Sequence, residues 1–284
     1  MELETLVDGW EFLEAPRADE AGNLWFSDVT KGGLHKRHSD GRIESFLRGR
    51  TWIGGIALNE GGGIVCSGKD GLILFDERSG TSRQLRTALD GLPIGAINDF
   101  CPTSDGGVVA GLIDAESVGA GRPPQSRPLI RLDPNGRVTR LWDGIGISNG
   151  IGFSPDGRRL YQSESYKTVW VYDVGADGAL HDRRVFADIQ DADGMAVDAE
   201  GGVWIARFDS WEVARFLPDG RRAGGLKVPI KEVQSVSFGG SDLRDLYIAT
   251  GSDFKNPTNL VVRTGCVFKA RSDVPGLALP KTRF

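Results

Sequence analysis

The segment Asp19-Glu20-Ala21-Gly22-Asn23-Leu24-Trp25-Phe26-Ser27-Asp28 sets the pattern of the chain, because its acidic, glycine-containing turn runs directly into a short apolar strand. Similar turns return along the sequence, and their glycines are Gly22, Gly61, Gly106, Gly157 and Gly201. Consecutive glycines of this series lie 39 to 51 residues apart, and a degenerate sixth copy begins at Ser241-Asp242. The chain is therefore built from one repeated unit.

A repeat of this length with several short strands per unit is typical of the blades of a β-propeller. Six copies fill the 284 residues, so we predict an all-β, six-bladed β-propeller that forms a single domain over residues 1–284. A pair of β-sandwiches is the main alternative, and it does not explain the repeat. The 40 glycines exclude a helical bundle, because glycine destabilises the interior of a helix.

The two ends of the chain fit a closed ring. Residues 2–7 (Glu2-Leu3-Glu4-Thr5-Leu6-Val7) read as a strand that precedes the first repeat. This strand is expected to become the outer strand of the last blade, formed near residues 235–280, where it would cover an open sheet edge. The longest insertion, residues 115–127, is expected to be a loop that covers one mouth of the ring.

Charge and composition narrow the class of partner. The net charge is −5 and the basic residues do not cluster, which argues against nucleic acid. No apolar stretch approaches the roughly 18 residues that span a membrane, and the acidic N-terminus does not resemble a signal peptide. The three separated cysteines do not suggest a disulfide framework. We expect a cytoplasmic protein that acts on a small molecule, and the sequence does not predict its oligomeric state.

Counting back eight residues from each repeat glycine identifies equivalent positions in different blades. Four blades carry polar residues there, namely Glu14, Asn98, Asn149 and Asp193, whereas the second has Ile53 and the sixth, counted from Asp242, has Gln234. The innermost strands of a propeller surround a central channel, so side chains at one depth meet near its axis. Asn-Gly and Asp-Gly pairs are also common turn sequences, and this is the alternative interpretation of Asn149 and Asp193.

Two carboxylates buried side by side are unfavourable without a cation. All the side chains at this depth would offer oxygen, which favours Ca²⁺, Mg²⁺ or Mn²⁺. Zn²⁺ is possible, although no histidine or cysteine lies at these positions. The pattern therefore predicts one divalent cation, with positions left open for a substrate or water.

The motifs that carry these residues also resemble a known family. They are Glu14-Ala15-Pro16, Asn98-Asp99, Ser148-Asn149-Gly150, Asp193-Gly194-Met195-Ala196-Val197-Asp198, Ser237-Phe238-Gly239-Gly240 and Gly265-Cys266-Val267-Phe268-Lys269. In this order and spacing the chain resembles, over essentially its whole length, the SMP-30/gluconolactonase/luciferin-regenerating-enzyme family. The resemblance implies a six-bladed propeller with one divalent cation in its channel, calcium being favoured, and an enzyme that hydrolyses a lactone.

The resemblance also implies roles for individual residues. Glu14, Asn149 and Asp193 would ligate the cation, which would polarise the lactone carbonyl and activate water. By the same resemblance, Asn98 would contact the metal or the substrate. As a mechanistic hypothesis, water would be activated by the metal, by Asp193 as the proton acceptor, or by both. Asp99 would contact the substrate or orient Asn98.

One position departs from the family pattern. Sugar lactonases of this family tend to carry arginine two residues before the Asn-Asp pair, where this chain has Ala96. Trp52, Ile53 and the nearby Phe100 would give the substrate pocket a more apolar wall, or they belong to the ordinary core. Both observations make a polyhydroxylated sugar lactone a less expected substrate.

Other functions remain open on the sequence alone. The same cation would serve hydrolysis of another ester, or lyase or isomerase chemistry on a cyclic or carbonyl substrate. A non-catalytic binding propeller would not need charged residues at the axis, and a strictosidine-synthase-like enzyme would not need the metal ligands. The histidines, His35, His38 and His181, fall in outer strands or turns, which argues against a Ser-His-Asp or Cys-His site.

Overall fold

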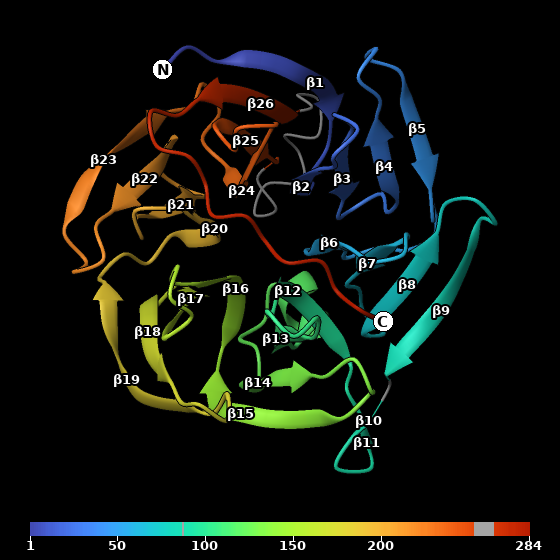
Figure 1. Ribbon diagram of the computed structural model, residues 1–284, viewed down its shortest axis with the longest axis vertical. Helices are drawn as coiled ribbons and strands as arrows, with labels where there is room; N and C mark the ends of the chain where they lie inside the picture. Colours follow the sequence, from blue (N-terminus) through green and yellow to red (C-terminus); the bar gives the residue numbers. More distant parts are fainter. Residues whose placement is uncertain (87, 253–263) are drawn as a thin grey trace.

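The structure, a computed structural model, describes residues 1–86, 88–252 and 264–284. Six four-stranded antiparallel sheets are arranged as blades around a central axis, as Figure 1 shows. The first blade contains β2 (Leu13–Ala18), β3 (Leu24–Asp28), β4 (Leu34–Arg37) and β5 (Ile43–Phe46); the second contains β6 (Ile56–Leu58), β7 (Ile64–Cys66), β8 (Leu72–Asp76) and β9 (Thr81–Arg86); the third contains β12 (Ala96–Pro102), β13 (Val108–Ile113), β14 (Arg127–Leu132) and β15 (Val138–Ile145). The six-bladed all-β prediction is confirmed.

The remaining blades follow the same order from the axis outward. The fourth contains β16 (Ile147–Phe153), β17 (Arg159–Ser165), β18 (Thr168–Val174) and β19 (Leu180–Ala187); the fifth contains β20 (Ala192–Val197), β21 (Val203–Arg207), β22 (Glu212–Phe216) and β23 (Arg222–Lys227); the sixth contains β24 (Val233–Gly239), β25 (Asp245–Thr250), β26 (Gly265–Arg271) and β1 (Glu4–Trp10). In each blade the first strand named is innermost and the last is outermost. The outermost strand of the sixth blade is therefore β1, the first strand of the chain.

The ring closes through the first strand of the chain. β1 pairs antiparallel with β26, with Glu4 opposite Lys269 and Thr5 opposite Phe268. The pairing that the N-terminal sequence predicts is therefore confirmed. It covers an edge of β26 that would otherwise expose unpaired backbone groups.

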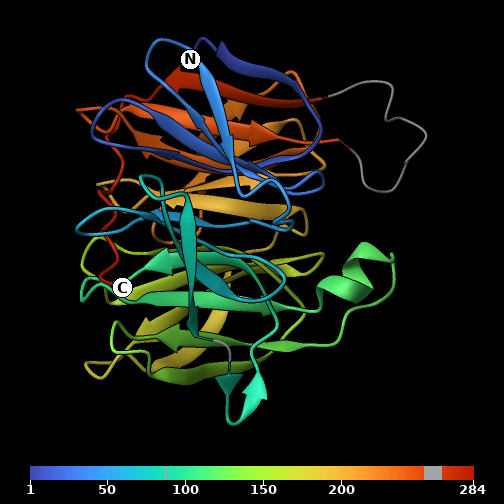
Figure 2. The same ribbon diagram turned by 90° about the vertical axis from the view of Figure 1, so that its right-hand side faces the viewer.

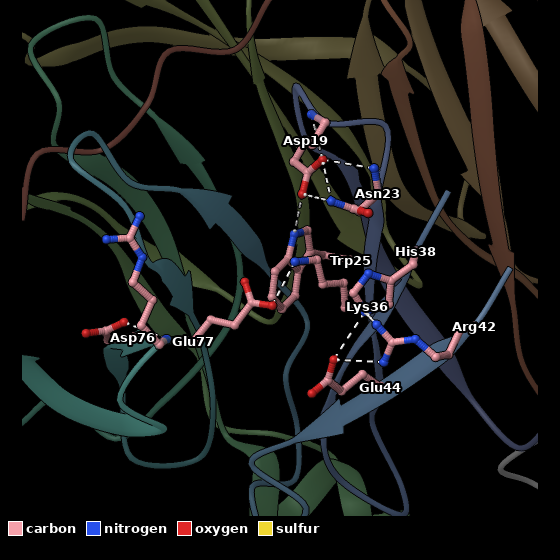
Figure 3. A network of polar contacts seen from close by, with 11 residues as sticks. Asp19, Asn23, Trp25, Lys36, His38, Arg42, Glu44, Asp76 and Glu77 are labelled. Carbon is pink, nitrogen blue, oxygen red and sulfur yellow. Dashed lines mark hydrogen bonds and ion pairs between the residues drawn. The ribbon is translucent and has the colours of Figure 1, made fainter. Parts of the chain in front are cut away.

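The acidic residue of the repeated turn holds the hairpin that follows it. The Asp19 carboxylate accepts a hydrogen bond of 3.2 Å from the indole nitrogen of Trp25, and its other contacts are visible in Figure 3. In the fifth blade, Asp198 accepts the equivalent bond of 2.9 Å from Trp204. Because the turn and the strand are joined in this way in both blades, the acidic-Gly-Trp pattern of the sequence has a direct structural cause.

Apolar side chains fill the spaces between neighbouring blades. Phe46 of the first blade lies 5.3 Å from Phe75 of the second, measured between ring centroids. Lys36 and Glu77 add an ion pair of 2.7 Å between the same two blades, also drawn in Figure 3. The core is thus divided into layers around the ring, and the axis is left for the side chains of the innermost strands.

Residues 272–284, here called the strap, cross one mouth of the channel, as the red trace in Figure 1 shows. Its backbone N–H groups donate to three blades: Leu277 to Val197 O (2.9 Å), Thr282 to Leu58 O (3.0 Å) and Arg283 to Gly106 O (2.8 Å). Figure 2 shows the strap on one face of the ring and the only helix of the described residues, α1 (Ala115–Gly119), on the other. We call the two ends of the channel the strap mouth and the helix mouth.

Two local features differ from the sequence-based expectation. The insertion at residues 115–127 was expected to be a loop, but it contains α1, whose first turn is capped by the Asp114 carboxylate. A small hairpin, β10 (Ala88–Leu89) and β11 (Leu92–Pro93), follows the second blade and was not predicted. In the part of the chain that the structure describes, no helix has the length and apolar character needed to cross a membrane.

One buried amide adds two further hydrogen bonds to the strap, which gives a stability prediction. Asn59 accepts hydrogen bonds from the Thr282 hydroxyl (2.9 Å) and the Phe284 N–H (3.0 Å). Asn59→Ala removes the acceptor of both groups, so we expect the free energy of unfolding to fall by about 2 kcal/mol in urea denaturation. The exposed Asn135 bonds only its own turn, so Asn135→Ala should change this energy by less than about 0.5 kcal/mol. Equal effects of the two substitutions would contradict the role of the strap.

Candidate functional site

The innermost strands of five blades contain a β-bulge at nearly the same depth. The pairing with the second strand shifts between Glu14 and Arg17, Ile97 and Phe100, Ser148 and Ile151, Ala192 and Met195, and Val233 and Ser235. Residues inside a bulge leave the regular ladder, and their side chains are re-aimed. Four of these bulges contain Asn98, Asn149, Asp193 and Gln234. In the first blade, Glu14 is the last paired residue before the bulge.

The second blade contributes no polar side chain at this depth. Its inner strand β6 begins only at Ile56 and pairs with β7 without a shift. The preceding Ile53 is fully buried in the apolar core. A Cβ atom on the neighbouring Gly54 would lie 2.6 Å from Asn98 Oδ1. This blade therefore supplies space for the Asn98 side chain instead of a ligand.

The Asn-Gly and Asp-Gly pairs lie within strands β16 and β20, so interpreting them as turns is wrong. Their glycines are required by the close approach of the innermost strands. A Cβ on Gly150 would lie 2.5 Å from the backbone nitrogen of Met195, and one on Gly194 would lie 2.9 Å from Gln234 O. Any larger residue would push neighbouring blades apart at the axis.

Hydrogen bonds connect the polar residues of the third, fourth and fifth blades. The Asn98 amide donates to Ser148 O at 3.0 Å and also to Asn149 Oδ1. The Asn149 amide donates to the Ser165 hydroxyl at 2.7 Å, and Ser165 donates to Ala192 O at 2.6 Å. Because its amide nitrogen is held by Ser165, Asn149 presents its oxygen to Asn98.

Three acidic side chains share this region. Burial raises the pKa of the Glu14 carboxyl well above its ordinary value, and the charges of Asp193 and Asp99 raise it further. Burial and the Asp99 charge raise the pKa of Asp193 in the same way. Burial raises the pKa of Asp99 to about 7, although the Arg17 charge opposes this change. Within the described ranges, no lysine or arginine lies within ion-pair distance of these three carboxylates.

The donor atoms of this cluster fit a hard divalent cation. In the described residues, no group of three Asp, Glu, His or Cys side chains is placed to hold a metal by itself. The candidate set is instead mixed, with the carboxylates of Glu14 and Asp193 and the carboxamide oxygen of Asn149. A divalent cation would offset the burial and the neighbouring negative charge that raise the pKa values of Glu14 and Asp193.

The two aromatic residues lie in different surroundings. Phe100 is buried in the core between the second and third blades, against Gly55, and also borders the channel. Trp52 belongs to a small apolar cluster that includes Ala96 and α1, near the helix mouth. Its backbone has a φ of 66°, which is rare for a bulky residue, and its buried indole nitrogen has no hydrogen-bond partner among the described residues.

Sequence comparison between blades missed the side chains that support this site. Ser165 stands on the second strand of its blade and Ser235 bonds Glu14 from the sixth blade. Neither position follows the eight-residue offset. A related contact occurs in the first blade, where Ser27, the penultimate residue of β3, donates to Ile53 O of the next blade at 2.5 Å.

The chain is similar to several known proteins. The family model described as the SMP-30/gluconolactonase/LRE-like region matches residues 12–252. The chain is 30% identical over 266 residues to a 6-deoxy-6-sulfogluconolactonase from Pseudomonas putida, covering 90% of this chain and 89% of the relative. It is also 30% identical to a pentonolactonase from Haloferax volcanii, covering 80% of this chain and 77% of the relative.

The fold is shared with solved structures. A calcium-binding protein, regucalcin, from Agrobacterium tumefaciens superposes with a TM-score of 0.86 at 23% identity, covering 99% of this chain and 97% of that one. At this identity, the likeness establishes the arrangement of the blades.

Proposed function

The chain belongs to the SMP-30/gluconolactonase/LRE-like family, and on this premise we propose that it is a lactone hydrolase dependent on one divalent cation. Two relatives named as lactonases, each 30% identical, support the reaction. The observation that carries the metal dependence is the burial of Glu14 and Asp193 together at the axis. Calcium is the proposed cation, because the donors are all oxygen and a structural relative is a calcium-binding protein.

Glu14, Asn149 and Asp193 would hold the cation, which when bound polarises a carbonyl and lowers the pKa of water. The Asp193 carboxylate accepts a proton from the attacking water while the water oxygen forms a bond to the lactone carbonyl carbon. The ring C–O bond then breaks, and the proton is returned to the departing oxygen to give a hydroxy acid. Asn98 would donate a hydrogen bond to the substrate in place of its present contact with Asn149.

Three further residues would shape the substrate pocket. Asp99, next to Asn98, would accept a hydrogen bond from a substrate hydroxyl or hold Asn98 in position. Trp52 would form an apolar wall at the helix mouth, beside Ala96, and Phe100 would support the channel from the core. This combination favours lactones with an apolar substituent over fully hydroxylated ones.

The proposal is tested by a hydrolysis screen on metal-stripped protein. Aldonolactones, aliphatic γ- and δ-lactones and aryl esters are each offered with calcium, magnesium, manganese or zinc, and acid release is followed with a pH indicator. We expect lactone opening only when a cation is added. Full activity in protein shown to be metal-free would eliminate the metal-dependent mechanism, and no turnover of any lactone would eliminate the lactonase.

A further inference from the structure

Ser165 lies between the fourth and fifth blades, next to two candidate ligands of the cation. It is the last residue of β17, the second strand of its blade, and its side chain is buried. Its hydroxyl oxygen accepts a hydrogen bond of 2.7 Å from the Asn149 amide, and the hydroxyl donates to Ala192 O at 2.6 Å. Ala192 immediately precedes Asp193 in β20. One hydroxyl therefore contacts the side chain of one candidate ligand and the backbone beside another.

These two bonds determine which way the Asn149 carboxamide faces. A hydroxyl has a single hydrogen, and Ser165 directs it to Ala192 O, so toward Asn149 it can only accept. Only the nitrogen of a carboxamide can donate, and the Asn149 oxygen therefore faces away from Ser165, toward Asn98. A flipped carboxamide could bond Ser165 only if the hydroxyl left the carbonyl group of Ala192, a fully buried residue.

Asn98 favours the same orientation, but its contact is not permanent. Its amide donates to Asn149 Oδ1 and, at 3.0 Å, to Ser148 O. In the proposed reaction Asn98 donates to the substrate in place of Asn149, and the Asn149 oxygen then faces the cation. The bond from Asn149 to Ser165 uses the other end of the carboxamide, so it is compatible with a bound cation and a bound substrate. Ser165 is thus the group that holds this orientation throughout.

The neighbouring backbone leaves little room to replace this contact. A Cβ atom on Gly150, the residue after Asn149, would lie 2.7 Å from Asp193 O. The innermost strands of the fourth and fifth blades are therefore already in close contact beside Ser165. A closer approach of these strands could not supply a new acceptor for the Asn149 amide.

We propose that Ser165 is a positioning residue for the cation, because it fixes the Asn149 carboxamide with its oxygen toward the axis and ties this ligand to the segment that carries Asp193. The inference rests on the proposed cation site. Without the hydroxyl, the Asn149 amide would lack its acceptor whenever the oxygen binds the cation, and an unpaired buried donor is unfavourable. Partners that orient metal ligands commonly change metal affinity by tenfold or more.

Calcium titration of metal-stripped protein by calorimetry tests the proposal. Ser165→Ala should weaken calcium binding about tenfold. Ser163, two residues earlier on β17, is also buried, and its hydroxyl has no hydrogen-bond partner among the described residues. Ser163→Ala removes the same atom from the same strand, so it is the matched control and should change the affinity less than about twofold. Equal calcium affinity in the wild type and Ser165→Ala would overturn the proposal.

A double-mutant cycle with Asn149→Asp separates orientation of the ligand from packing. A carboxylate has two oxygens and no nitrogen that needs an acceptor, so it presents an oxygen to the cation in either orientation. In the Asn149→Asp background, Ser165→Ala should therefore change calcium affinity less than about threefold. An equal loss in both backgrounds would show that Ser165 acts through packing alone, and it would overturn the proposal.

The same titrations distinguish this inference from the proposed function. A wild-type protein that binds no divalent cation would reject the cation site itself. Tight calcium binding that Ser165→Ala leaves unchanged would reject only the positioning role. If Asn149→Asp does not fold, the comparison of Ser165→Ala with Ser163→Ala still decides the question. None of these measurements requires a lactone.

Discussion

Asp193→Asn should lower kcat/KM for lactone hydrolysis by about a thousandfold and weaken cation binding by about a hundredfold. The substitution keeps the shape of the side chain but removes the proton acceptor and one of the two charged ligands. Steady-state kinetics with a lactone found in the screen and calorimetric titration of calcium measure the two effects. The paired loss is expected because the same carboxylate serves both functions.

Asp191 offers a control from the same segment. It precedes β20 by one residue and is engaged by Arg207 at 2.8 Å and by the Ser210 hydroxyl. Asp191→Asn should leave kcat/KM and calcium affinity within about threefold of the wild type, because this carboxylate is already paired with arginine. If Asp193→Asn retained activity, or if both variants lost it equally, the proposed role of Asp193 would be wrong.

The metal-free protein should become less stable as the pH rises from about 4 to about 7. The pKa of Asp99 is raised in the folded state to about 7, mainly by burial, and those of Glu14 and Asp193 are raised in the same direction. In this pH range the unfolded chain releases protons that the folded chain retains, so ionisation favours unfolding. Thermal denaturation in chelator should therefore show a Tm that falls by about 5 °C or more between pH 5 and pH 8.

Calcium and one substitution provide the controls for this prediction. Added calcium should raise Tm more at pH 8 than at pH 5, because protons and the cation compete for the same carboxylates. Asp99→Asn should reduce the slope of Tm against pH in chelator, since it removes one buried acid. A Tm that rises with pH in chelator would contradict the raised carboxyl pKa values that burial gives these three residues.

The fold and the depth of the candidate site were both available from the sequence, because a repeated unit makes positions comparable within one chain. The offset that selects Glu14 and Asp193 works because equivalent residues occupy equivalent places in different blades. The β-bulges that turn these side chains toward the axis had no separate signal. They became visible only when the pairing of the first two strands was known.

Features that depend on contacts between blades could not be predicted. The strap has no repeat to compare with, and its hydrogen bonds reach strands far away in the sequence. α1 is too short to produce a helical pattern in the sequence.

The pairing of β1 with β26 also has a consequence for biosynthesis. β1 leaves the ribosome first, and the strand it pairs with emerges only after nearly all the other blades have been translated. Until then β1 has no pairing strand, and the two end blades expose the apolar faces that pack together in the closed ring. Unpaired strands and exposed apolar surfaces favour contacts with other chains. Ring closure is thus a long-range step, and such steps are slow compared with the formation of local hairpins.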